Sequence, residues 1–376
     1  MLNNNQPIKL NFNLSFTKLS DLSKPEAQRT SDVLILKPQL AYDPKIGDSD
    51  YSLFFSYAKT KNPLAWEKYK LFYAEPKMDG VRGQFVIQYC KDSDSLKVYC
   101  LSRANRRLTS VDHIVNDLSA NPYLLDYLRH YATHPATGQP TGAANLVLDC
   151  ELYVKDAEFR YINGLTNRKI SDSETSKLLA YIFQIYFADS QGNAIETVDP
   201  FNFEHWVYSK SHGLGLAENL YYSLAPRFHI ASVEQLTTLA NKLKAGHYEG
   251  LVLKSPDYRH FNGRTKHWLK LKFRRTGTFK LLGVAFGEGK CAGTCGAIKI
   301  GDAIGQTTMV GTGMTDQDRD ELASLSSTCL TQNIYVQVSY MTKTGSSLRE
   351  PVYEGIRYDL NGRPQDQASL DIFTLR

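Results

Sequence analysis

The stretch EPKMDGVRG, residues 75 to 83, places a lysine two residues before an Asp-Gly turn and an arginine just beyond it. A lysine amine has an ordinary pKa of about 10.4, so nucleophilic attack at pH 7 is handicapped by about 4.6 kcal/mol. Lys77 would therefore need neighbouring cations or a desolvated site that lowers its pKa. Gly80 lets backbone approach a phosphate closely, and Arg82 offers a planar fork that suits phosphate oxygens. The motif alone fits a phosphate site and an ordinary hairpin with solvated charges about equally well.

A second group of cations lies in HWLKLKF, residues 267 to 273. Strand alternation places Lys270 and Lys272 with Trp268 on one face, while the two leucines between them face the core. Two ammonium groups therefore project together from this strand.

Carboxylates occur at two further places. In NLVLDCELYV, Asp149 and Glu151 share one face of an apolar strand, which is costly without a cation. Mg²⁺, a ribose hydroxyl or a structural Arg or Lys would each satisfy them. In YEGLVLK, Glu249 and Lys254 flank another apolar run, and simple alternation puts them on opposite faces. Either a bulge intervenes there or the two residues act from the strand ends.

The elements that must position these residues fall into two groups. From Val33 to about Phe273, short strand-like runs alternate with helix-like stretches, which predicts an α+β domain with antiparallel sheets. Beyond it, about five short strands with Gly-rich turns and one acidic helical stretch predict a small β-barrel of the oligonucleotide-binding (OB) type. We expect a polar N-terminal arm at residues 1–30, a first domain at 31–275 and the barrel at 276–376.

Composition is compatible with this plan. The 376 residues are 42% hydrophobic, enough for two domains with full cores. Lys and Arg number 44 against 39 Asp and Glu, and the net charge of +5 fits an anionic partner without requiring one. The first residues show no secretory pattern and no apolar stretch reaches ~18 residues, so we expect a cytoplasmic protein with no membrane partner.

Five motifs in order form a recognisable pattern: KMDGVR (77–82), SRAN (102–105), LDCELYV (148–154), EGLVLK (249–254) and WLKLK (268–272). They resemble the motifs of the covalent nucleotidyltransferase superfamily, and in particular those of ATP-dependent DNA ligases of the compact bacteriophage type. The resemblance spans roughly residues 33–360. It implies an adenylation (nucleotidyltransferase) domain followed by an OB-fold domain, and roles in DNA replication, repair and recombination. It also implies ATP and Mg²⁺ (or Mn²⁺) as cofactors, nicked double-stranded DNA as partner, a monomer that encircles DNA, and the host cytoplasm as location if the source is viral.

The resemblance also assigns roles to single residues. Lys77 would attack the α-phosphate of ATP and hold AMP as a phosphoramidate, and Glu75 would meet the adenine edge through its backbone. Arg82 and Arg103 would contact ribose and the DNA-end phosphate. Glu151 would contact ribose and metal, and Glu249 would contact metal. The α-phosphate would be held by Lys254, Lys270 and Lys272, and the nick phosphate by Arg264. The three lysines would also lower the pKa of Lys77.

Two places depart from the family pattern. Where the family has Phe-Asp, Phe183 is followed by Gln184; we choose Phe183 as the adenine-stacking aromatic, with Tyr181 and Tyr186 as rivals. REPVYEGIRYDL, residues 349 to 360, resembles the motif that orients pyrophosphate and supplies Arg349 and Arg357. In that motif Gly355 replaces a family arginine and Leu360 replaces a lysine.

Three other functions remain open from the sequence. An mRNA capping guanylyltransferase would use GTP, and an RNA ligase would share the lysine motif. A non-catalytic nucleic-acid-binding protein would keep the barrel and a decayed first domain. Covalent labelling by ATP but not GTP would separate a DNA ligase from the capping enzyme, and the absence of any label would favour the binding protein.

Overall fold

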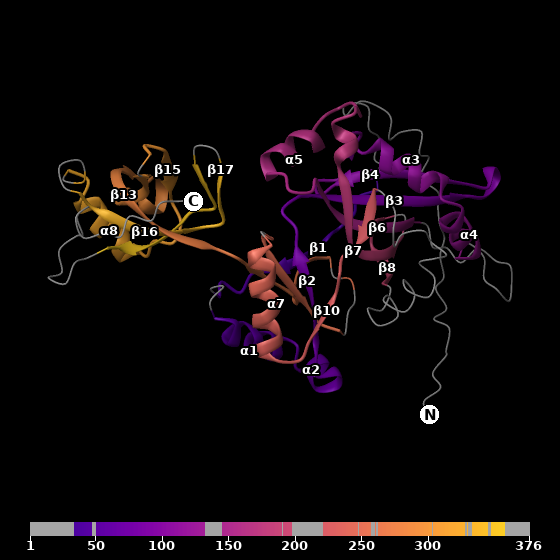
Figure 1. Cartoon of the computed structure of the whole chain (residues 1–376), viewed down its shortest axis with the longest axis horizontal. Coiled ribbons are helices and arrows are strands. Elements are labelled where there is room, and N and C mark those ends of the chain that lie inside the picture. The colour runs from indigo at the N-terminus through magenta and orange to yellow at the C-terminus, as the bar shows by residue number, and fades with distance from the viewer. Residues whose placement is uncertain are drawn as a thin grey trace. The chain divides into compact units, whose positions relative to one another are not determined.

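A computed structural model describes residues 34–357, apart from 47–49, 132–144, 190, 198–220, 247, 257–259, 261, 303, 328, 330–332 and 345–346. The expected N-terminal arm at 1–30 and Leu360 lie outside the described residues. The chain divides after Leu271 into two compact units, and each is described by itself (Figure 1). Both are mixtures of helices and largely antiparallel sheets, as the sequence predicted.

The first unit contains a five-stranded sheet that carries Lys77. Its order is β1 (Gln39–Tyr42), β12 (Gly263–Lys272), β11 (Gly250–Lys254), β2 (Phe72–Lys77) and β10 (Phe228–Ile230). Strand β2 runs antiparallel to β11 and β10, whereas β1 runs parallel to β12. Helices α1 (Tyr51–Lys61), α2 (Pro63–Tyr69) and α7 (Val233–Ala245) lie beside this sheet (Figure 1). The Phe72 ring packs on Phe55 of α1 and Trp66 of α2, so alternation turns Glu75 and Lys77 to the other face.

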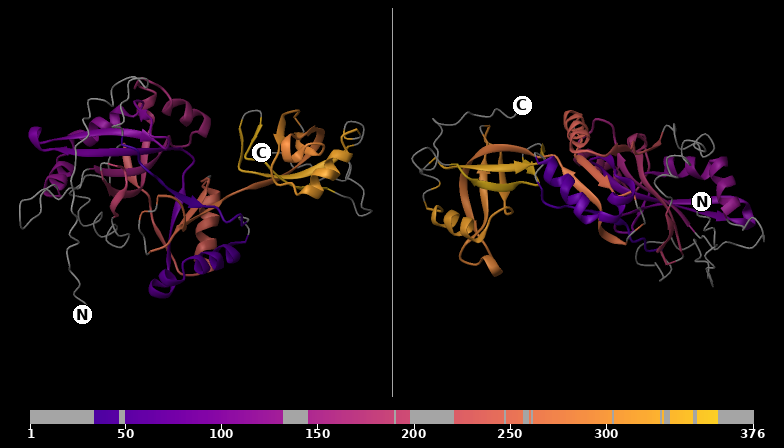
Figure 2. Two further views of the ribbon diagram at one scale, coloured as in Figure 1. Left: turned by 180° about the vertical axis from the view of Figure 1, so that it is seen from behind. Right: turned by 90° about the horizontal axis from the view of Figure 1, so that it is seen from below.

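The second sheet of this unit has seven strands. They are β5 (Arg107–Leu108), β4 (Ser95–Ser102), β3 (Val81–Cys90), β6 (Asn145–Tyr153), β7 (Leu179–Ala188) and β8 (Ala194–Thr197) in order, with β9 (Tyr222–Leu224) parallel to β7. Helices α3 (Asp112–Ala120), α4 (Pro122–Tyr131) and α5 (Phe159–Thr166) pack on it. The views in Figure 2 show these helices gathered along one side of the sheet.

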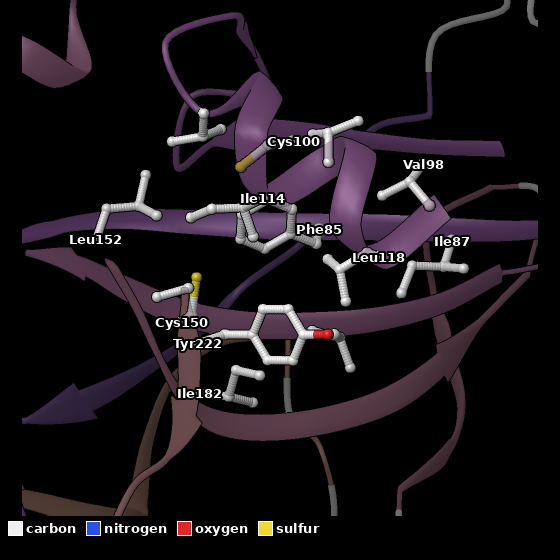
Figure 3. Packing of buried hydrophobic residues seen from close by; sticks show 14 of the residues in the cluster. Phe85, Ile87, Val98, Cys100, Ile114, Leu118, Cys150, Leu152, Ile182 and Tyr222 are labelled. Atoms are coloured by element: carbon white, nitrogen blue, oxygen red, sulfur yellow. The ribbon is translucent and has the colours of Figure 1, made fainter. Parts of the chain in front are cut away.

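The core of the first unit explains how this sheet presents its polar side chains. Leu148, Cys150 and Leu152 of β6 are buried with Phe85 of β3 and Ile114 of α3 in one apolar cluster (Figure 3). Because strand side chains alternate, the residues between them on β6 point to the opposite face. That face therefore carries the carboxylates of β6.

The second unit is built on β13 (Arg275–Phe286), β14 (Cys295–Gly301), β15 (Thr307–Val310), α8 (Asp316–Ser324), β16 (Tyr335–Tyr340) and β19 (Val352–Ile356), with a hairpin of β17 (Thr342–Thr344) and β18 (Ser347–Arg349). Helix α8 is the acidic helical stretch expected from the sequence, and it begins with a capping box between Thr315 and Asp318. The sheet order is β15-β14-β13-β16-β19, so the pairing of the described strands is open and does not confirm the OB-type β-barrel that we expected. Strand β15 ends at Val310. Just beyond it, Thr312 O accepts a backbone hydrogen bond from Tyr353 N of β19 at 2.9 Å.

No helix in the described part of the chain is long and apolar enough to cross a bilayer.

Candidate active site

Lys77 ends β2 and meets a carboxylate from the neighbouring strand. Its Nζ donates a hydrogen bond to Glu249 Oε2, and the Glu249 N–H donates to Lys77 O at 3.1 Å. Glu249 stands just before β11, so it acts from a strand end, which was one of the two possibilities left by the sequence. The Lys77 side chain is 24% exposed, whereas that of Glu249 is 5% exposed. Lys77 is therefore the more accessible member of the pair.

The Asp-Gly turn brings the end of β2 against β6. A Cβ at Gly80 would lie 2.3 Å from Leu152 O and 2.8 Å from Glu151 Cγ, so only glycine fits at this close approach. The turn thus requires glycine because of the neighbouring strand. This packing places Glu151 beside Lys77, close enough for the two charges to interact.

The charges around Lys77 do not lower its pKa, which corrects the expectation from the sequence. Burial favours the neutral amine, but Glu249 and Glu151 outweigh it and raise the pKa of Lys77. Burial also raises the pKa of Glu151 to about 7, against the attraction of Lys77. The expectation failed because it considered only the three lysines and not the carboxylates. In this arrangement Lys77 is a protonated ammonium.

Glu151 and Glu249 are also the donors that a divalent metal could use. Among the described residues, no group of three or more His, Cys, Asp or Glu side chains could hold a metal ion. Mg²⁺ is commonly held by one or two carboxylates together with substrate phosphates. The two carboxylates therefore fit a metal that binds together with a nucleotide.

Glu75, two residues before Lys77, belongs to a different charge cluster. Its carboxylate accepts from Arg227 Nε at 2.8 Å, lies 2.6 Å from Arg227 Nη2, and lies 2.5 Å from Lys254 Nζ. All three side chains are less than a tenth exposed. Burial, reinforced by Arg227 and opposed by Glu75, lowers the pKa of Lys254 to about 8. Lys254 also donates to Phe183 O at 2.9 Å and lies 4.1 Å from the Trp268 ring centroid.

Arg82 is committed to structural partners. Its Nε donates to Asp149 Oδ1 at 2.8 Å, its Nη2 donates to Asp149 Oδ2, and its Nη1 donates to Gln39 O at 2.7 Å. Asp149 is fully buried. The cation required by this carboxylate is therefore a structural arginine, one of the alternatives left open, whereas Glu151 faces Lys77.

A β-bulge sets the direction of Phe183. Asp149 pairs with Gln184 and Cys150 pairs with Ile182, so Phe183 is an extra residue in β7. Its ring is half-buried, 5.2 Å from the Arg82 guanidinium and 5.5 Å from Lys254 Nζ. The rival Tyr186 is fully buried under His260, and Tyr181 packs edge-on against Tyr153. Phe183 is thus the most accessible of the three rings.

Lys270 and Lys272 do share a face, because Leu269 and Leu271, which alternate with them along β12, are each 1% exposed. Their ammonium groups have different partners. Lys270 Nζ lies 3.7 Å from Asp43 Oδ2, and Lys272 donates to both carboxylate oxygens of Glu350 at 2.7 Å within the second unit.

The remaining predicted arginines lie at the edges of the described elements. Arg103 is exposed in the turn after β4, and Arg264 is exposed on β12. Arg349 ends β18, and Arg357 Nη1 donates to Thr278 Oγ1 at 3.3 Å. Gly355 has φ 147°, a conformation that a side chain rarely adopts, so an arginine would be strained there.

Arg227 and His260 are parts of the site region that the sequence did not reveal. Arg227 reaches Glu75 across 152 residues, and no local pattern marks it. Glu75 lies two residues from the candidate nucleophile, and a buried carboxylate needs a cation partner. This need was the available signal for a cation such as Arg227.

Comparisons with known proteins agree on the fold. A search of curated proteins found no significant match. The solved structure named Pmar-Lig_Pre. has a TM-score of 0.61 and 23% identity, over 86% of this chain and 68% of that one. A structure from work on Lig E DNA ligases, described as "DNA binding with a minimal scaffold", has a TM-score of 0.55 and 16% identity, over 86% of this chain and 100% of that one. The chain therefore has the fold of solved DNA ligases.

The family follows from the sequence model. The model for the ATP dependent DNA ligase domain matches residues 56–272, which is more than half of the chain and includes every motif strand of the first unit. The chain belongs to this family and is an ATP-dependent DNA ligase, as the five motifs indicated.

Proposed function

We propose that this ligase seals nicks between a 5′-phosphate and a 3′-hydroxyl in duplex DNA, with Lys77 as the residue that becomes joined to AMP. The observation that carries the proposal is the position of Lys77 between Glu249 and Glu151. The amine is partly exposed there, and its charge is balanced by groups that can also bind a metal. A capping or RNA-joining activity has no comparable support from the family match.

The proposed reaction has three phosphoryl transfers. Lys77 Nζ, after losing its proton, forms a bond to the α-phosphorus of ATP while the bond to pyrophosphate breaks. The adenylyl group then passes to the 5′-phosphate and frees Lys77, and finally the 3′-hydroxyl attacks that phosphate and releases AMP. The protein contributes mainly position and charge, because phosphoryl transfer depends on both.

The metal in this proposal is Mg²⁺, with Mn²⁺ as a substitute, held by Glu151 and Glu249. When bound it would stabilise negative charge on the phosphates. With these carboxylates engaged by a metal, Lys77 would lose the partners that now raise its pKa. Phe183 would stack on adenine, with the Glu75 backbone at its edge. Lys254 is bound to Glu75 and to Phe183 O, so its proposed role is to hold these two adenine-binding residues in place.

The domain roles are also proposals. We assign adenylation to residues 31–275 and an OB-type module to 276–376. Five strands and one helix, with the bond between Tyr353 N and Thr312 O at the open side, fit a partly open barrel of that type. A monomer whose second module closes on DNA, with Arg264, Arg349 and Arg357 toward phosphates, would work in the cytoplasm of the cell or viral host.

Nick sealing tests this proposal directly. A labelled duplex with one 5′-phosphorylated nick should be joined in the presence of ATP and Mg²⁺, and binding should weaken steeply as salt rises. GTP in place of ATP should give no joining. Binding to the nick without joining would favour a non-catalytic protein and contradict the proposal.

A further inference from the structure

Four consecutive backbone carbonyls of the segment 36–39 each accept a hydrogen bond from a different part of the first unit. The donors are Asn105 Nδ2 to Leu36 O at 3.1 Å, His260 Nε2 to Lys37 O at 3.0 Å, Gly263 N to Pro38 O at 3.2 Å, and Arg82 Nη1 to Gln39 O at 2.7 Å. Asn105 Oδ1 also accepts from Leu36 N at 3.0 Å. The segment 36–39 thus connects the SRAN turn, the start of β12 with His260 just before it, and the Arg82–Asp149 pair.

The tautomer of His260 follows from its two partners. A carbonyl oxygen only accepts, so Nε2 must carry the hydrogen that reaches Lys37 O. The other nitrogen, Nδ1, lies 2.8 Å from Gln184 Nε2, which only donates. Nδ1 must then be an acceptor, and His260 is neutral in this arrangement. An amide at position 184 is required for this pairing, because a carboxylate could not donate to Nδ1.

Gln184 is linked through the β7 bulge to Phe183, the candidate adenine-stacking residue. The bulge leaves Phe183 as the extra residue next to Gln184, which pairs with Asp149. The Tyr186 ring of the same strand lies against the His260 ring at a tilt of 35°, with ring centroids 4.3 Å apart, and the Tyr186 hydroxyl accepts from Gln84 Nε2 at 3.1 Å. His260 and Gln184 therefore contact each other beside the bulge of β7 that presents Phe183.

We propose that Gln184 and His260 are positioning residues of the adenylation site, which hold segment 36–39 against Arg82 through a histidine that must stay neutral. The inference rests on the proposed function of the site. The charged and titratable groups around His260 are the Arg82–Asp149 pair from β3 and β6, and Tyr186 from β7. The Lys37 ammonium donates to Asn193 Oδ1 at 3.1 Å. Burial lowers the pKa of His260, in keeping with a neutral ring.

The first test is an NMR titration of the histidine rings in the full chain, with His260 assigned from the His260→Gln spectrum. In the wild type His260 should stay neutral to below its ordinary pKa of about 6.5. In Gln184→Glu, which has the same length as the wild-type side chain, an ionised carboxylate can only accept, so His260 would donate from both nitrogens and its pKa should rise above that value. A His260 that titrates alike in both proteins, or that is already charged at pH 7 in the wild type, would overturn the proposal.

The second test measures self-adenylylation from ATP. Gln184→Glu and His260→Gln should each lose about 10- to 100-fold in kcat/KM, because Arg82 and Phe183 are displaced although neither substituted residue itself contacts the substrate. The loss should appear mainly in the KM for ATP. If Gln184→Glu does not fold, His260→Gln and the wild-type titration still decide.

The chain offers a matched control. His113 Nε2 also bonds to a backbone carbonyl, Leu178 O at 2.9 Å, and its ring also lies against a tyrosine, Tyr221. It stands on α3, on the other face of the sheet, so His113→Gln should keep the kcat/KM of the wild type. If His260→Gln behaves like His113→Gln while the wild type adenylylates normally, the positioning role is wrong. A wild type that forms no adenylate would instead reject the proposed function.

Discussion

Glu75 and Lys77 stand two residues apart on the same face of β2, yet their surroundings differ. Glu75 is 2% exposed and lies between Arg227 and Lys254, with both carboxylate oxygens used. Lys77 is 24% exposed and shares Glu249 and Glu151, two carboxylates for one cation. The Glu75 cluster has an extra positive charge and the Lys77 cluster an extra negative one.

The difference separates a structural ion cluster from a reactive one. Around Glu75 every charged group has close partners, so a change there should mainly cost stability. Around Lys77 the excess carboxylate gives a metal a place to bind and leaves the amine accessible. Perturbations of the two clusters should therefore be read out by different measurements.

The largest effect is expected from Lys77→Arg. A guanidinium preserves the charge facing Glu249 but cannot lose its proton and act as a nucleophile. Nick joining should fall by about 10⁴-fold or more, with little change in unfolding free energy. Lys97→Arg, an exposed lysine on β4, is the control and should join nicks normally. Joining by Lys77→Arg at the rate of that control would refute the assignment of the nucleophile.

A smaller loss of activity is expected from Glu249→Gln. The substitution removes a carboxylate that balances Lys77 and could hold the metal, so adenylylation should slow by about 100-fold and need more Mg²⁺. Initial rates of label transfer across a Mg²⁺ series would measure both changes. Glu234→Gln, at an exposed position on α7, should show neither change. An unaltered Mg²⁺ requirement in Glu249→Gln would mean that this residue does not hold the metal.

The sequence predicted much of the Lys77 cluster and little of the Glu75 cluster, for a physical reason. Period-two alternation correctly placed Asp149 and Glu151 away from the β6 core, and Lys270 and Lys272 away from Leu269 and Leu271. Such patterns describe one strand at a time. The partners Arg227 and His260 come from distant segments, and only the three-dimensional pairing of β2, β10, β11 and β7 brings them together. The raised pKa of Lys77 could not be predicted for the same reason.

Removal of Arg227 should affect stability more than activity. In Arg227→Met, Glu75 keeps only Lys254, and the unfolding free energy should fall by about 2 kcal/mol. Urea denaturation followed by circular dichroism would measure it. Arg129→Met provides the contrast, since Arg129 pairs with Asp94 and Asp126 at a side-chain exposure of 45%, and its loss should change stability much less than that of Arg227. Equal losses in the two variants would argue against a structural Glu75 cluster.

The last expected effect is a pH dependence of the unfolding free energy that comes from Lys254. The pKa of Lys254 is lowered to about 8 from an ordinary 10.5. The contribution of Lys254 to the unfolding free energy is therefore complete above pH 10.5 and is lost as the pH falls through 8. The difference in unfolding free energy between wild type and Lys254→Met should therefore favour the wild type more as the pH rises across this window. The slope should reach at most about 1.4 kcal/mol per pH unit. A difference that does not vary with pH would show that Lys254 titrates normally.

The central claim is tested most directly by locating the adenylyl group. Wild-type protein incubated with ATP and Mg²⁺ and no DNA should gain the mass of one adenylyl group, and peptide mapping should find it on Lys77. Addition of nicked DNA should then remove it. An adduct on another residue, or no adduct in a protein that still seals nicks, would contradict the account.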